Sequence, residues 1–174
     1  AAVCMVATMN DMTAPSVSLE GKNIWLVQSY PILSRKVLAA KLKLHLILTV
    51  IPAIPLIVAV EWLIKPDLAF AVLIPIAAFL FILLMAAFGL FTNLKMPNLN
   101  WTSEIVPIKQ SLNVMIALFG GWVIIIALAG LYILLDGFLS PLVYLFAVCI
   151  LILVFCIILI RWIFTKGAEI FARL

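Results

Sequence analysis

The sequence predicts an all-α, polytopic transmembrane helical bundle, and three observations support this prediction. Hydrophobic residues make up 68% of the chain and charged residues only 10%, and the mean hydropathy is +1.37. A soluble domain has about 45–50% apolar and about 25% charged residues, so this chain cannot cover its surface with polar groups. Four apolar runs of about 21–25 residues can each cross a hydrocarbon core of about 30 Å. They lack the period-two alternation of barrel strands, so we expect helices.

The chain divides into three regions. Residues 1–12 contain about ten apolar residues, too few to cross a membrane, and are interpreted as the end of a span that begins upstream. Residues 13–43 form a more polar, basic segment. Residues 44–174 contain the predicted bundle, with four spans at about 44–64, 68–92, 114–135 and 141–164 and a loop at 93–113.

Lysine and arginine residues indicate the orientation. Ten of the eleven lie before the first span, in the 93–113 loop or from Arg161 to the C-terminus, and only Lys65 lies in a turn on the other side. The positive-inside rule therefore places both ends of the sequence and this loop in the cytoplasm. The cluster from Arg35 to Lys43 fits the entrance of a span, where long cationic side chains reach lipid phosphates. A nucleic-acid site or a surface-lying helix fits it less well, because leucines interrupt its faces.

Two segments on the predicted cytoplasmic side contain more than connecting turns. Residues 18–31 are expected to form one short helix with Ser18 as its N-cap and Pro31 at its end. Ser34 is expected to cap the helix that becomes the first full span. In the 93–113 loop, two prolines bracket Trp101, a residue type suited to the membrane interface.

The spans themselves contain signals for packing. In the third span, Ala117, Gly120 and Gly121 form a small-residue face that favours close approach of a neighbouring helix. Pro52 and Pro55 in the first span predict a kink.

Motifs for catalysis and for metal binding are missing from the sequence. The three cysteines lack metal-ligand spacing, and the single histidine, His45, has no partner for a metal pair. No phosphate-binding GxxxxGK[ST] loop, HExxH or GxSxG motif occurs. We therefore expect a non-enzymatic protein with no catalytic residue, no metal site and no cofactor.

Two stretches resemble a known family. SLEGKNIWLVQSYPILSRKVLAAKL, from Ser18, resembles a segment of the permease subunits of bacterial ABC exporters of the second type, where an EGK-x-x-W helix precedes a Pro-x-x-Ser-like turn. NLKMPNLNWTSEIVPIKQS, from Asn93, is similar to a loop of ABC exporter permeases of low-GC Gram-positive bacteria. The resemblance covers residues 18 to about 113, and beyond them it depends only on the number and spacing of the spans.

The resemblance implies a bundle of six spans in a bacterial plasma membrane, in which residues 1–12 end the second span and residues 18–33 include a cytoplasmic coupling helix. It implies a separate ATP-binding cassette ATPase as partner, and a second permease bundle or a homodimer. Membrane lipids are expected partners and nucleic acid is not. The implied ATPase-coupling candidates are Glu20, Gly21, Lys22, Trp25, Pro31, Ser34 and Arg35. The implied candidates in the second cytoplasmic loop are Pro97, Trp101, Glu104, Lys109 and Gln110.

The function expected from this resemblance is that of the membrane-spanning subunit of an ATP-driven exporter, which forms the translocation pathway. Two alternatives remain open: a membrane scaffold or assembly protein that transports nothing, and an ion-coupled secondary transporter. An ATPase gene beside this one would favour the exporter. An ionisable residue at mid-membrane in an upstream segment would favour the secondary transporter.

Overall fold

The computed structural model describes residues 2–103, 105–109, 111–135 and 137–174, and the regular elements within them are all helical. Four helices are long and apolar enough to cross a membrane, so the chain is a multi-pass, all-α membrane protein, as predicted. The elements in chain order are α1 (Ala2–Met9), the 3₁₀-helix η1 (Ser18–Asn23), α2 (Ile24–Ser29), α3 (Ser34–Ile64), α4 (Leu68–Lys95), α5 (Ile105–Lys109), α6 (Leu112–Leu135), α7 (Pro141–Trp162), the π-helical turn η2 (Ile163–Gly167) and α8 (Ala168–Arg173).

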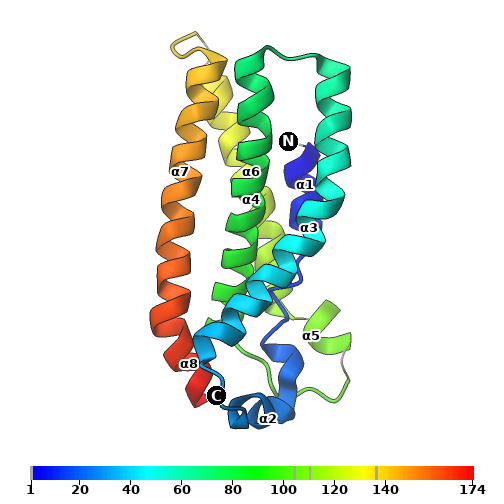
Figure 1. Ribbon diagram of the computed structural model, residues 1–174, viewed down its shortest axis with the longest axis vertical. Helices are drawn as coiled ribbons and strands as arrows, with labels where there is room; N and C mark the ends of the chain where they lie inside the picture. The colour runs from blue at the N-terminus through cyan, green and yellow to red at the C-terminus, as the bar shows by residue number, and fades with distance from the viewer. Residues whose placement is uncertain (1, 104, 110, 136) are drawn as a thin grey trace.

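Helix α4 forms the centre of the bundle and packs against α1, α3, α6 and α7 (Figure 1). The C-terminal half of α4 is largely buried, with Phe81, Met85 and Leu90 among its inaccessible side chains. Helices α6 and α7 instead keep broad apolar faces exposed, as expected for helices that contact lipid. The short α1 packs against α3, α4 and α6 and begins part-way along the bundle (Figure 1).

Helix α3 begins at Ser34, one residue before the start that an N-cap at Ser34 would give. The basic residues from Arg35 to Lys43, which precede the predicted span, therefore form the first part of the same helix. Ser34 does not cap it, because the N-cap position is Leu33 and no side-chain bond is made there. Pro52 and Pro55 lie inside the helix, which bends between a slanted first half and an upright second half (Figure 1). Proline removes a backbone donor and displaces the preceding turn, which explains the bend.

The segment predicted as one helix over residues 18–31 consists of η1 and α2. Gly21 has φ +53° and ψ −139°, which interrupts the helical backbone inside η1 and which glycine adopts without a Cβ penalty. Helix α2 ends at Ser29, and Tyr30 is extended before Pro31, as the residue before a proline usually is.

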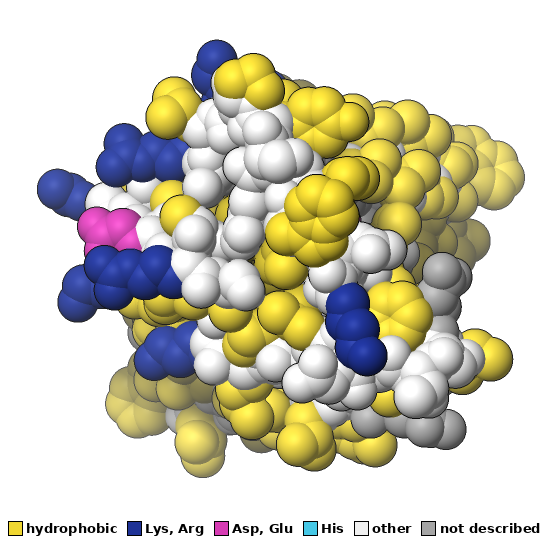
Figure 2. All heavy atoms as spheres, turned by 90° about the horizontal axis from the view of Figure 1, so that it is seen from below, with side chains coloured by type: hydrophobic (Ala, Val, Ile, Leu, Met, Phe, Trp, Pro, Cys, Tyr) yellow, Lys and Arg dark blue, Asp and Glu magenta, His cyan; other side chains and the backbone are white. Residues whose placement is uncertain are grey.

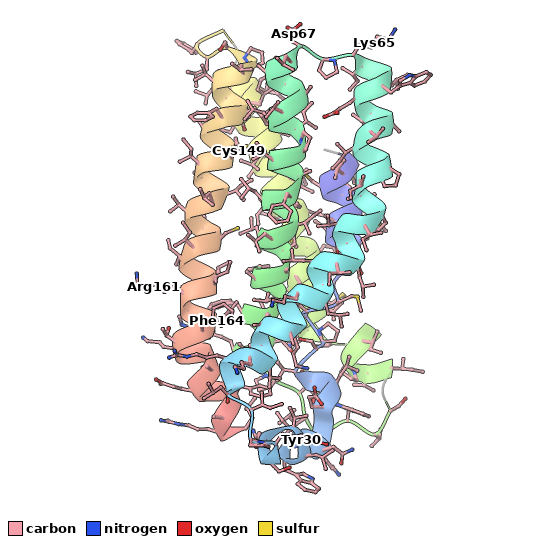
Figure 3. All side chains as sticks on the ribbon, in the orientation of Figure 1. Tyr30, Lys65, Asp67, Cys149, Arg161 and Phe164 are labelled. Carbon is pink, nitrogen blue, oxygen red and sulfur yellow. The ribbon has the colours of Figure 1, made fainter. Side chains whose placement is uncertain are left out.

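The two ends of the bundle differ in charge. Helices α2, α5 and α8 lie at one end together with the C-terminus, while Lys65 and Asp67 lie at the other (Figures 1 and 3). Figure 2 looks at the first end and shows most of its Lys and Arg side chains gathered on one side. We call it the basic end. Its described cationic side chains are Lys22, Arg35, Lys36, Lys41, Lys43, Lys95, Arg161, Lys166 and Arg173.

Candidate docking site at the basic end

Helices η1 and α2, residues 18–29, lie across the basic end, and we call them the docking element. Asn93, near the end of α4, holds its first residues. The Oδ1 atom of Asn93 accepts hydrogen bonds from the backbone N–H groups of Val17 at 2.6 Å and Ser18 at 3.0 Å. The Nδ2 atom of Asn93 donates to Ser18 Oγ at 2.7 Å. Asn93 is fully buried, so its amide replaces the water that these backbone groups would otherwise bind.

The hydroxyl of Ser18 therefore does not cap a helix, contrary to the sequence prediction. Besides Asn93 it binds the loop after α4, because its Oγ accepts a hydrogen bond from the backbone N–H of Asn98 at 3.0 Å. The predicted cap would bind the helix that follows Ser18, whereas the hydroxyl binds a backbone donor 80 residues away.

Trp101 closes over the docking element. Its Nε1 donates a hydrogen bond of 2.6 Å to the carbonyl oxygen of Ser18. A Cβ atom at Gly21 would lie 2.8 Å from Cζ2 of the Trp101 ring, so only glycine permits this approach as well as the positive φ. The half-buried Trp101 thus joins two segments that lie far apart in the sequence.

An ion pair links the docking element to α3. The Nζ atom of Lys41 lies 2.6 Å from Oε1 of Glu20 and also donates to the carbonyl oxygen of Ser16 at 2.7 Å. The side chains of Lys41 and Glu20 are only 15% and 27% exposed. Partial desolvation makes such a pair stronger than an exposed surface pair, although part of the gain offsets its desolvation. The carboxylate of Glu20 therefore contacts α3.

A further link reaches the C-terminal helix. The Nε2 atom of Gln28 donates a hydrogen bond of 2.8 Å to the carbonyl oxygen of Phe171 in α8. Ile24 and Phe171 belong to one buried cluster with Leu38 of α3 and Leu94 of α4. The docking element is thus bonded to, or packed on, α3, α4 and α8 together.

The opposite face of the docking element is free. Lys22 is exposed, Trp25 is 62% exposed and Tyr30 is 58% exposed, and none of these side chains makes a hydrogen bond or ion pair with the described residues. Figure 3 shows Tyr30 at the tip of the basic end. Pro31 and Arg35 are exposed beside it.

The remaining candidates are less central. Ser34 and Pro97 are half-buried, and Lys109 is the last residue of α5. Glu104 and Gln110 lie outside the described residues. The structure therefore brings the first part of the 93–113 loop against the docking element, through Trp101 and Asn98.

The small residues of α6 lie against α1 and α4. Ala117 is fully buried. A Cβ at Gly121 would lie 2.5 Å from Cγ2 of Thr8, and one at Gly120 would lie 2.8 Å from Cε1 of Phe88. The sequence predicted close packing at these positions, and the structure supplies the partners.

Buried polar residues between α1 and α3 were not identified from the sequence. The Nδ2 atom of Asn10 donates a hydrogen bond of 2.7 Å to Oγ1 of Thr49, and Oγ1 of Thr13 lies 3.5 Å from Nδ1 of His45. Both carboxylate oxygens of Asp11 are buried without a hydrogen-bond partner among the described residues. The sequence contained one signal for these polar contacts, the spacing of His45 and Thr49, which are four residues apart and therefore share a helix face.

Replacing Trp101 by phenylalanine tests the contact between the loop and the docking element. This change keeps a ring over Gly21 but removes the donor to Ser18, so we expect a loss of about 1 kcal/mol in the free energy of unfolding. Thermal unfolding in detergent measures it. The matched control is Trp62→Phe, at a side chain that is 77% exposed on α3. Equal effects of the two changes would show that the Trp101 hydrogen bond contributes nothing.

No group of three or more His, Cys, Asp or Glu residues that could hold a metal ion occurs in the part of the chain that the structure describes. Comparisons with protein-family models, curated proteins and solved structures found no significant match to this chain. The resemblance to exporter permeases therefore depends on the two quoted sequence stretches alone. What the fold shows by itself is an all-α, multi-pass membrane protein with a short helical element bonded across its basic end.

Proposed function

We propose that this protein is the membrane-spanning permease subunit of an ATP-driven exporter in a bacterial plasma membrane. In this proposal the basic end faces the cytoplasm, and a separate ATP-binding cassette ATPase docks on the free face of the docking element. The chain provides part of the translocation pathway, and the ATP-hydrolysing residues belong to the partner.

The distribution of charge supports the orientation. The described cationic side chains gather at the basic end, whereas Lys65 lies at the opposite end beside Asp67 (Figure 3). Lysine and arginine are retained on the cytoplasmic side of multi-pass proteins, so the positive-inside rule favours a cytoplasmic basic end.

The observation that carries the proposal is the attachment of the docking element to several spans at once. Glu20 binds Lys41 of α3, Ser18 binds Asn93 of α4, and Gln28 binds the backbone of α8. A force on the free face therefore reaches three helices through short, buried or half-buried bonds. Coupling in an exporter requires such a link, because ATP binding must shift the bundle between two packings that differ by a few kcal/mol.

The test is purification of the tagged protein from its native host in mild detergent, with partners identified by mass spectrometry. We expect a stoichiometric ATPase subunit with the native protein and its loss with Lys22→Glu, since Lys22 is exposed on the free face and the change reverses its charge. The control is Lys65→Glu at the opposite end, which should leave the ATPase bound.

The other outcomes separate the alternatives. Stoichiometric partners without ATPase activity would contradict the exporter and favour a scaffold. Absence of any partner in several detergents, together with ion-driven uptake by vesicles containing the purified protein, would favour a secondary transporter.

A further inference from the structure

A cavity of about 240 Å³ lies beside α3 at the basic end. One wall is formed by Lys41, Leu44 and His45 of α3, and the other by side chains from residues 12–20. Along α3 the cationic residues end at Lys43 and the continuous apolar run begins at Leu44. The cavity therefore lies where the polar and apolar parts of the helix meet, which is the level of phospholipid headgroups.

The polar groups of the cavity have unused hydrogen-bonding capacity. The Nζ atom of Lys41 donates to Glu20 and Ser16, which leaves one of its three N–H groups. The Oε2 atom of Glu20 accepts no hydrogen bond from the residues that the structure describes. The side chain of His45 is 1% exposed, and its Nε2 has no partner among those residues. The cavity thus presents one cation and one anion, and the buried ring of His45 lies in its wall.

Two apolar stripes lead away from the cavity along the bundle. On α3 the three side chains have the spacing i, i+4, i+7, which places them on one face of that helix, and in the other stripe the two methionines of α1 are one turn apart. Each stripe ends in a residue that lines the cavity, Leu44 on one and Met12 on the other. The exposed side chains are Leu44, Leu48 and Ile51 on α3, and Met5, Met9 and Met12 on and just after α1.

We propose that this cavity binds the headgroup of a phospholipid that carries a primary ammonium beside its phosphate, as phosphatidylethanolamine does. The phosphate accepts the free N–H of Lys41, and the ammonium donates to Oε2 of Glu20. The acyl chains lie along the two apolar stripes. This site is independent of the exporter proposal, since it needs only a membrane around α1 and α3.

The ion pair gives the site a preference among headgroups. A zwitterionic headgroup complements both members of the pair, and a primary ammonium can donate hydrogen bonds to the carboxylate. A choline headgroup has no N–H donor, so it leaves Glu20 without a hydrogen bond. A glycerol headgroup carries no cation, so its phosphate charge is repelled by Glu20.

Native mass spectrometry of the detergent-solubilised protein with equal concentrations of phosphatidylethanolamine, phosphatidylcholine and phosphatidylglycerol tests this site. We expect one bound phosphatidylethanolamine, retained about tenfold more than either other lipid. One additional charge-assisted hydrogen bond strengthens binding by about this factor. Equal retention of the three lipids, strongest retention of phosphatidylglycerol, or no retained lipid would overturn the proposal. This comparison uses the unmodified chain, so it does not depend on the folding of a variant.

Glu20→Gln locates the site. The amide oxygen can still accept from Lys41, but the negative charge is removed, so the preference should shift from phosphatidylethanolamine to phosphatidylglycerol. The control is Glu169→Gln, an exposed carboxylate on α8 at the same end, which should leave the preference unchanged. An unchanged preference in Glu20→Gln, or the same shift in both variants, would overturn the assignment to this cavity.

Discussion

Replacing Asn93 by leucine is expected to destabilise the protein by about 2–6 kcal/mol, because two buried backbone donors lose their acceptor and each costs about 1–3 kcal/mol. Leucine has the same branched four-heavy-atom side-chain shape as asparagine and is larger, so none of this effect would come from a cavity. The backbone N–H groups of Val17 and Ser18 would lie against apolar surface, and Ser18 Oγ would lose one of its two donors. We expect the docking element to detach from α4 before the spans separate.

Two measurements separate this local effect from general unfolding. Thermal unfolding in detergent gives the total loss, and limited proteolysis within residues 13–29 reports detachment of the docking element. The control is Asn98→Leu, since the side chain of Asn98 is exposed and makes no hydrogen bond with the described residues. If Asn93→Leu and Asn98→Leu unfold at the same temperature and are cleaved at the same rate, the Asn93 hydrogen bonds do not hold the docking element.

The four spans could be predicted from the sequence because membrane thickness sets the length of an apolar helix. At the end of the bundle opposite the basic end, each predicted span begins or ends within a few residues of a helix. The start of α3 was predicted to within one residue, since the helix expected to follow an N-cap at Ser34 begins at Ser34 itself, ten residues before the predicted span. Lysine, arginine, alanine and leucine are good helix formers, and no proline or glycine occurs between Ser34 and Leu44. The hydrophobic boundary therefore marks where the membrane begins but not where the helix begins.

The docking site could be predicted only in pieces. Both of its segments were singled out, but their association depends on contacts between residues 75–83 positions apart. Asn93 reads as an ordinary polar residue at the end of a span, and Trp101 as an interfacial one. Each has a different partner only because α4 ends beside Ser18. Local patterns indicate residue types suited to caps or interfaces, whereas the tertiary structure decides which donor reaches which acceptor.

Gly89→Ala is expected to destabilise the protein through a close contact between α4 and the chain that leads to the docking element. A Cβ atom at position 89 would lie 2.6 Å from Oγ1 of Thr13 and 3.1 Å from the backbone nitrogen of Ala14. Thr13 and Ala14 are themselves buried, so neither can move freely to make room. Overpacking of this kind costs about 1–3 kcal/mol in the free energy of unfolding.

The matched control is Gly130→Ala in α6, where no atom lies within 4 Å of the added Cβ. Alanine favours a helix over glycine by about 1 kcal/mol, so this variant should be as stable as the native protein or more stable. Both variants gain the same helix propensity, and a difference of about 1–3 kcal/mol in thermal unfolding would therefore measure the contact alone. Equal stability would show that residues 13–14 can withdraw from α4 at no cost. Such freedom would contradict the tight attachment that the proposed transmission from the docking element to the spans requires.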